Sequence, residues 1–244
     1  MRNHARIRRG AGDGGEQGSI GEISVKRHHA SLATEPLSRG LAWFWFGQAR
    51  VLTDDLDGAA DALDKGSVGA VPGGEMSTVS LALLAELRHV QGEHTEALAA
   101  ATEAVERVAV YPQSGLWAWA LYSSLPYALE LGQQGRHDEA IDFMRELLDE
   151  NQPRTPGVTT SVVVVLAALA VLRGDGETAG ALLDNAGIAM IQSGIRTPVD
   201  MILYAHYLQR LTTMGGTGTQ RDREQAEAMS PSEAIALGLG APAR

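Results

Sequence analysis

The stretch that decides the fold is LELGQQGRHDEAIDFMRELLDENQP, residues 129–153. Gly135 divides it into an apolar segment and a second segment in which Ala140, Ile141 and Met144 recur with helical spacing. A glycine after a helix permits the left-handed conformation that ends it, and an early alanine in the next helix lets the two backbones approach closely. The stretch therefore predicts two antiparallel helices joined by a tight turn.

The pattern Gly-x4-Ala recurs along the chain. It begins at Gly92, Gly135 and Gly174, and a weaker copy has Asp54 in the glycine place. Asp tolerates the left-handed conformation better than most residues. A further glycine, Gly215, ends one more apolar segment, and successive starts lie 38, 43, 39 and 41 residues apart. This spacing predicts four two-helix units and a fifth leading helix, with a period of about 40 residues.

These units divide the chain into three parts. Residues 1–36 are expected to be a disordered head, residues 37–214 the helical-repeat domain, and residues 215–244 a linker with a short terminal helix and a tail. Leading helices are expected at 76–91, 116–134, 159–173 and 198–214, and second helices at 97–108, 138–150 and 177–192. The capping-box sequence that starts at Ser230, with Pro231 and Glu233, predicts the terminal helix through Leu239.

The repeat resembles the tetratricopeptide family. Residues 129–153 are similar to the family pattern of a glycine, an aromatic residue two positions on, an acidic pair, an alanine and a closing proline, with His137 in the aromatic place. His94 takes that place in the unit before, whereas Gly176 departs from it. The resemblance implies an all-α, right-handed superhelix. Units longer than the family's roughly 34 residues, and the tail EAMSPSEAIALGL, also look like the C-terminal helical region of large actinobacterial ATPase-type (LuxR-like) transcriptional regulators.

Composition and charge indicate the compartment of the protein and the classes of partner that it is expected not to bind. The chain has no cysteine and a net charge of −10, so a reducing compartment is expected and the folded part should repel nucleic acid. Its first residues lack an apolar signal segment, and its longest apolar run, Val162 to Leu172, is shorter than the roughly 20 residues of a membrane span. A cytoplasmic protein without membrane association is expected. The head, which carries four arginines before residue 10, is interpreted as a solvated arm.

Few residues are left for chemistry. No phosphate-binding loop or serine-nucleophile motif is present, so the sequence predicts no catalytic residue, no cofactor and no metal site. His94, His137 and His206 lie in different units, and no His-x3-His or His-Glu-x2-His zinc spacing is present. His94 and His137 are interpreted as packing residues at turns, and His89 as a surface cation near a helix end. Asp55, Asp57 and Gly58 partly imitate a calcium loop, but an acidic helix start explains them better.

Aromatic residues are the candidates for partner contact. Trp117 and Trp119 point to different sides of one helix, so one of them, with Tyr122 or Leu121, is a candidate to face the groove lined by leading helices, while the favoured interpretation places these residues in the core. A second expected stripe, on the last leading helix, consists of Tyr204, Tyr207 and Arg210. At the other end of the chain, Trp43 to Phe46 should leave at least one ring exposed, which suggests a homo-oligomer contact.

The sequence therefore predicts a non-catalytic helical-repeat scaffold that binds a protein or peptide in signalling or transcriptional control. Three alternatives stay open. One is a small-molecule sensor with a closed apolar cavity near Trp117 and Tyr122. Another is a fragment of a larger regulator. The third is an enzyme on an α-helical scaffold, which would need carboxylates or histidines from several leading helices to converge with perturbed pKa values.

Overall fold

The computed structural model describes residues 36–69, 74–110, 117–148, 155–193, 198–215 and 226–240. Within these ranges the chain is helical and contains no strand, which confirms the all-α class. The expected disorder of residues 1–35 and the linker at 216–225 lie outside the described residues. The helices are α2 (Pro36–Val51), α3 (Leu56–Gly69), α4 (Glu75–Gln91), α5 (His94–Val110), α6 (Trp117–Gln133), α7 (His137–Leu147), α8 (Pro156–Arg173), α9 (Gly176–Ser193), α10 (Pro198–Thr213) and α12 (Pro231–Gly238).

The turns between paired helices have the predicted left-handed residue. Gly92, Gly135 and Gly174 have φ of 81°, 76° and 79°, and Asp54 has φ of 58°. Each turn also closes with the same two backbone hydrogen bonds; at the first glycine the N–H of Gly92 donates to His89 O at 3.0 Å, and the N–H of Glu93 donates to Arg88 O at 2.9 Å. This is the Schellman arrangement, which satisfies carbonyls that the helix end would otherwise leave unpaired.

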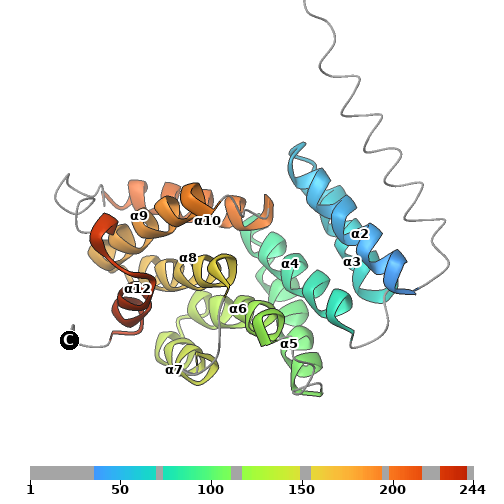
Figure 1. The fold of residues 1–244 in the computed structure, drawn as a ribbon, viewed down its shortest axis with the longest axis horizontal. Helices are drawn as coiled ribbons and strands as arrows, with labels where there is room; N and C mark the ends of the chain where they lie inside the picture. Colours follow the sequence, from blue (N-terminus) through green and yellow to red (C-terminus); the bar gives the residue numbers. More distant parts are fainter. Residues whose placement is uncertain are drawn as a thin grey trace, which may run out of the picture.

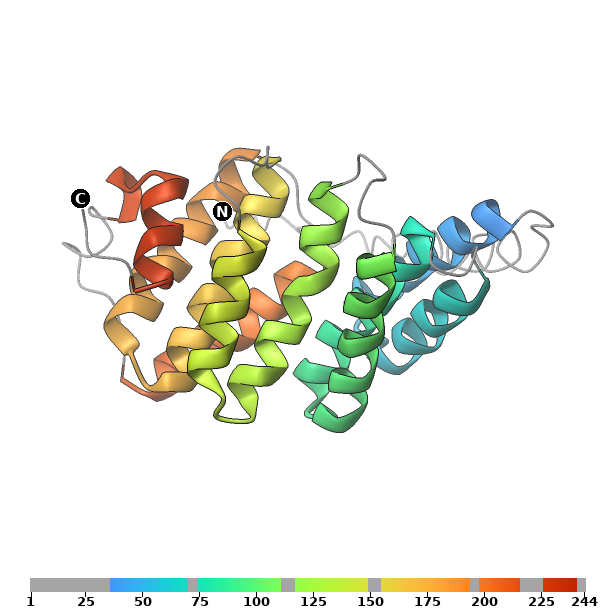
Figure 2. The same cartoon turned by 90° about the horizontal axis from the view of Figure 1, so that it is seen from below.

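The alanines of the pattern are buried within each helix pair. Ala59, Ala97, Ala140 and Ala179 are all 0% exposed. Helix α2 packs on α3, α4 on α5, α6 on α7 and α8 on α9, so each left-handed turn joins two antiparallel neighbours. Figure 2 shows the helices standing side by side along the length of the molecule. The residues expected to bring the backbones together are therefore confirmed as buried.

The leading helices form one layer, because α2 packs on α4, α4 on α6 and α6 on α8. Helix α8 has the longest continuous buried segment of them, in which every residue from Thr160 to Val171 is buried. Its sequence is long and apolar enough for a membrane span, but 67% of that window is buried inside the protein. An all-round apolar helix is expected where neighbours cover every side, and α8 contacts α6, α7, α9, α10 and α12.

Helix α10 does more than extend the row of leading helices. It packs on α8 and α9 and also reaches back to α4 and α2, and Figure 1 shows it running from α9 toward α4. Its buried residues Val199, Leu203, Tyr207 and Leu211 are spaced four apart and make one stripe along the helix. This stripe faces the leading helices. Helix α10 therefore covers part of the face that a regular solenoid would leave as an open groove.

The terminal helix α12 begins as predicted, with Ser230 and Glu233 forming both hydrogen bonds of a capping box and Pro231 in the first turn. It packs on α8 and α9. The Asn185 side chain holds the approach to this helix by donating hydrogen bonds to the carbonyls of Ala226 and Met229, at 3.1 and 2.9 Å. Helix α12 thus caps the C-terminal end of the helical layers.

The alanine contact can be tested with Ala140→Glu. Because Ala140 is 0% exposed, a glutamate there must overpack the helix pair or bury a charge, and we expect a loss of roughly 3 kcal/mol or more in the free energy of unfolding. Urea unfolding measures the loss. Ala99→Glu is the matched control, because Ala99 is exposed on α5, and it should change the midpoint little. Equal midpoints for the two variants would contradict the assignment of Ala140 to the helix interface.

Candidate functional site

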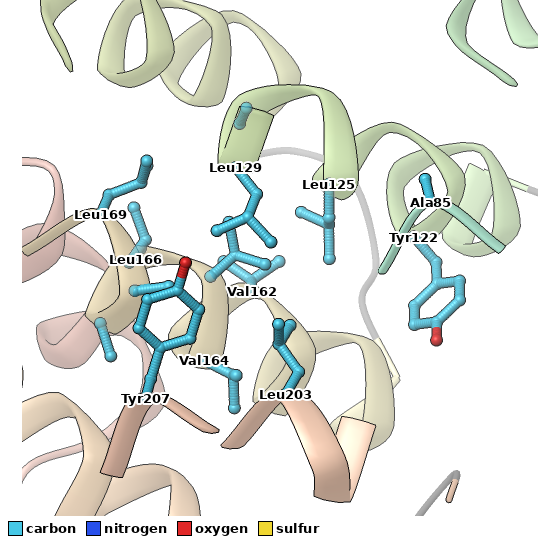
Figure 3. Close-up of a cluster of buried hydrophobic side chains, with 14 of the residues drawn as sticks. Ala85, Tyr122, Leu125, Leu129, Val162, Val164, Leu166, Leu169, Leu203 and Tyr207 are labelled. Atoms are coloured by element: carbon cyan, nitrogen blue, oxygen red, sulfur yellow. The ribbon is translucent and has the colours of Figure 1, made fainter. Parts of the chain in front are cut away.

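Polar and ionisable side chains gather where α10 meets the leading helices. All are buried in the structure; they are Glu86 and His89 on α4, Tyr122 and Glu130 on α6, Ser161 on α8, and Asp200 and Tyr207 on α10. Apolar residues surround them, and Figure 3 shows Leu203 and Tyr207 pointing from α10 toward Leu129, Val162 and Leu166. Burying such groups is costly unless they bind one another. We call this group the buried polar cluster.

His89 connects two parts of the cluster. The Glu130 carboxylate Oε1 lies 2.6 Å from His89 Nδ1, and the Tyr207 hydroxyl lies 2.6 Å from Nε2. A carboxylate only accepts, so Nδ1–H donates to Glu130, and Nε2 accepts from the tyrosine hydroxyl when the ring carries its one proton on Nδ1. Burial raises the pKa of Tyr207 far above its usual range, which keeps this hydroxyl protonated as the donor. The chain of bonds joins α6, α4 and α10.

Two further histidines lie beside His89. The ring centroids of His94 and His206 are 5.1 and 6.1 Å from that of His89. His94 Nδ1 lies 3.6 Å from Glu130 Oε2, and the His94 side chain is 37% exposed. Burial lowers the pKa of His206, and the neighbouring His89, Arg210 and His94 lower it further. A neutral imidazole with a free nitrogen is the form that can bind a metal ion.

The other half of the cluster holds two carboxyl groups. Asp200 Oδ1 accepts hydrogen bonds from Ser161 Oγ at 3.1 Å and Tyr122 Oη at 3.5 Å. Glu86 is 0% exposed. Burial and the negative charge of Asp200 hold the pKa of Glu86 well above its usual range, and the neighbouring Tyr122 hydroxyl offsets part of this rise. Helix α10 is therefore held on the leading helices by polar contacts as well as by its apolar stripe.

Sequence reasoning missed this cluster, although the repeat register contains a signal for it. Glu130 stands five residues before its turn glycine, where the neighbouring units have Leu87 and Leu169. Glu86 stands six residues before its glycine, where the next unit has Leu129. All of these positions are buried. An acid at a position that is a buried leucine in other units indicates a special role, and comparing the units position by position would have found it.

The predicted aromatic contacts are only partly exposed. Tyr122 and Tyr207 are 4% and 0% exposed, so the expectation that they face a partner is corrected, because both hydroxyls bond inside the cluster. Trp119 is 40% exposed, while Tyr204 and Arg210 are half-buried. These three stay predicted contacts. The side chain of Trp117 lies outside the described residues.

At the other end of the molecule, the Trp43–Phe46 segment exposes one large ring, as predicted. Trp45 is 57% exposed, whereas Phe44 and Phe46 are buried. A homo-oligomer through this end stays a prediction.

Two further interpretations can be compared with the structure. His89 is 1% exposed, so its interpretation as a surface cation is wrong; the helix turns its side chain inward onto Glu130 and Tyr207. The acidic segment after Asp54 is a helix start, as favoured over a calcium loop. There Asp55 Oδ1 accepts from the N–H of Gly58 at 3.0 Å and its other oxygen pairs with Arg50.

The titration of Glu86 gives a prediction. Its pKa is raised in the folded protein, so its contribution to stability is complete below the unfolded pKa of about 4.3 and is lost as pH rises through the folded value. Glu86→Gln cannot ionise. We therefore expect the melting temperature of the variant minus that of the unaltered chain to increase from pH 5 to pH 8. The increase is about 2–4 °C for each kcal/mol of unfolding free energy that the unaltered chain loses.

Glu233→Gln is a control of opposite sign. Hydrogen bonds from Ser230 lower the pKa of Glu233, so this carboxylate stabilises above its unfolded pKa, and the variant should be less stable than the unaltered chain at neutral pH. Thermal unfolding followed by circular dichroism measures both variants. A Glu86→Gln advantage that is the same at pH 5 and pH 8 would contradict a buried, protonated Glu86.

Comparison with known proteins adds no family. No protein-family model matches the chain, and no curated protein matches it. The resemblances to the tetratricopeptide family and to the actinobacterial regulators therefore stay predictions, which rest on the residues quoted above.

Proposed function

We propose that the chain is a non-catalytic scaffold of tetratricopeptide type that binds a helical segment of a partner protein on its layer of leading helices. The paired helices, their alanine contacts and the recurring left-handed turns support a right-handed superhelix with a period of about 40 residues. Stacking of this kind makes a long recognition surface without any special reactive residue. Signalling or transcriptional control is the setting that the sequence resemblance favours.

The observation that carries this proposal is the position of α10. This helix packs on α2, α4 and α8, helices that come from three different pairs. It presents a stripe of residues at four-residue steps, which is how an amphipathic helix lies in a groove on its partner. The face thus already binds one helix of the same chain, and α10 indicates the kind of ligand that the face accepts.

The polar cluster indicates what the face selects. Asp200 receives hydrogen bonds from Ser161 and Tyr122, and Tyr207 donates to His89. Asp200 and Tyr207 are seven residues apart, two helical turns along one stripe. We infer that a partner helix with an acid and a tyrosine at this spacing would satisfy the same buried groups. A helix without this acid and tyrosine would leave the buried polar groups of the leading helices unpaired. The cost of these unpaired groups is the larger part of the difference in binding free energy between the two kinds of helix.

The enzyme alternative has one observation in its favour. Histidine and carboxylate side chains from α4, α6 and α10 converge, and the pKa of Glu86 is strongly raised. However, Glu86, His89 and Glu130 are 1% exposed or less, so α10 and the leading helices leave these groups little surface on which an organic substrate could bind. Binding of a helix accounts for both the burial and the hydrogen bonds. The small-molecule alternative gains no support from Tyr122, whose hydroxyl bonds to Asp200.

The proposal can be tested with a fluorescein-labelled peptide of residues 196–215 and the full-length chain. In the unaltered chain, the tethered α10 competes at an effective concentration on the order of millimolar, so the peptide should bind weakly. Leu203→Ala leaves a cavity under α10, because Leu203 is 1% exposed. We expect this variant to bind the peptide at least about tenfold more tightly, since its own α10 competes less. Fluorescence anisotropy in the presence of a chelator gives the affinity.

Leu208→Ala is the matched control, because Leu208 lies on the outer side of the same helix and is 38% exposed. It should bind the peptide as weakly as the unaltered chain does. Tyr207→Phe is a milder second variant that removes only the hydroxyl and its bond to His89. If both inward variants stay folded by circular dichroism and bind the peptide no better than Leu208→Ala, the leading-helix face is not a helix-binding surface.

A further inference from the structure

We propose that His89, His94 and Glu130 form a binding site for a transition-metal ion of the zinc class. Each offers one ligand atom, and these atoms all lie within 4.8 Å of one another. Imidazole nitrogens with a carboxylate oxygen are a donor set typical of zinc sites, and three protein ligands leave the fourth tetrahedral position to a water molecule. Among the described residues, no other group of three histidine or acidic side chains meets this condition.

The fold brings these ligands together through the turn at Gly92. His89 lies in the last turn of α4, and His94 begins α5. The left-handed turn folds one helix back on the other, so that the two rings stand 5.1 Å apart between centroids. Glu130 approaches from α6, the neighbouring leading helix. The sequence spacing of the histidines does not match a known zinc motif, because the turn rather than one helix face supplies the geometry.

The distances fit a shared ion. Two ligands of a tetrahedral zinc ion are separated by roughly 3.3 Å, given bond lengths of about 2.0–2.1 Å. The Glu130 carboxylate lies 2.6 Å from His89 Nδ1 through one oxygen and 3.6 Å from His94 Nδ1 through the other. His89 Nδ1 and Glu130 Oε1 are closer together than two ligands of one ion, so their hydrogen bond must open when the ion binds.

Two buried atoms of the group lack a hydrogen-bond partner. Glu130 Oε2 and His94 Nδ1 are buried, and neither makes a hydrogen bond among the described residues. Buried polar atoms are nearly always satisfied, and each exception needs an explanation. The His89–Glu130 hydrogen bond satisfies only one oxygen of Glu130 and one nitrogen of His89. An ion bound to the free oxygen of Glu130 and to His94 satisfies both remaining atoms.

Tyr207 completes the site from α10. In a metal site the second nitrogen of a ligating histidine usually donates to an outer partner, which fixes the ring. When Nδ1 of His89 binds the ion, it gives up its hydrogen bond to Glu130 Oε1; the ring then carries its proton on Nε2, and Nε2–H donates to the Tyr207 oxygen, 2.6 Å away. Metal binding thereby fixes the position of the ring that contacts α10. The site therefore connects the ion to the helix that covers the leading-helix face.

The test is a titration of the chelator-treated, full-length chain with Zn²⁺ by calorimetry, and with Co²⁺ by its visible absorption. The parent for this experiment carries His28→Ala and His29→Ala, because adjacent imidazoles in the head would bind zinc on their own. We expect one equivalent to bind with tetrahedral Co²⁺ bands, and Zn²⁺ to raise the melting temperature. His94→Ala in this parent should weaken binding at least tenfold. Its side chain is 37% exposed, so the fold should tolerate the change.

His137→Ala is the matched control, because His137 holds the same place after the turn glycine in the next unit. It should bind zinc as tightly as the parent. Glu130→Gln should bind as weakly as His94→Ala, and Tyr207→Phe should lose about tenfold through its outer contact. The proposal is overturned if the parent binds no stoichiometric ion, or if His94→Ala and His137→Ala bind equally well. Peptide exchange is measured with a chelator present, so it can succeed while zinc binding fails, and the reverse.

Discussion

The left-handed residue at each helix-pair turn is the constraint on which the rest of the structure depends. Gly92, Gly135, Gly174 and Asp54 lie in turns that reverse the chain within two to four residues, and a fully buried alanine five residues later fixes how closely the second helix returns. Because each turn has the same geometry, the leading helices lie in one layer. That layer creates the face on which α10 rests. Without a common turn the helices would still be amphipathic, but no shared surface would form.

The face and its covering helix explain why ionisable groups are buried in a core of leucine, valine and alanine. A buried carboxyl such as Glu86 destabilises the folded protein when it is charged, so a purely structural core would favour leucine there, as at Leu129. The acids and His89 instead lie beside Tyr122 of α6 and meet Asp200 and Tyr207 of α10. Polar contacts of this kind add less to stability than to selection of one matching partner, because a mismatched helix leaves them unsatisfied.

The proposed helix-binding face and the proposed metal site share part of the buried polar cluster. Helix α10 approaches the polar cluster from the open side of the layer, whereas the ligands His89 and His94 flank the turn between α4 and α5 and Glu130 lies on α6. His89 belongs to both, since one ring nitrogen faces Glu130 and the other faces Tyr207. In the proposed site, an ion on Nδ1 of His89 leaves the ring proton on Nε2, the nitrogen that faces Tyr207. The metal site and the helix-binding face are thus coupled through a single imidazole.

Local sequence determined the helices, their turns and the buried alanines, because helical spacing, left-handed glycines and the capping box at Ser230 act over only a few residues. It also determined that one aromatic ring near Trp45 is exposed. The place of α10 was decided by tertiary structure, since its apolar stripe could have continued the row of leading helices. The inward turn of His89 and the meeting of Glu130, His94 and Tyr207 were decided in the same way. These residues are up to 118 positions apart, and only the packing of α4, α6 and α10 brings them together.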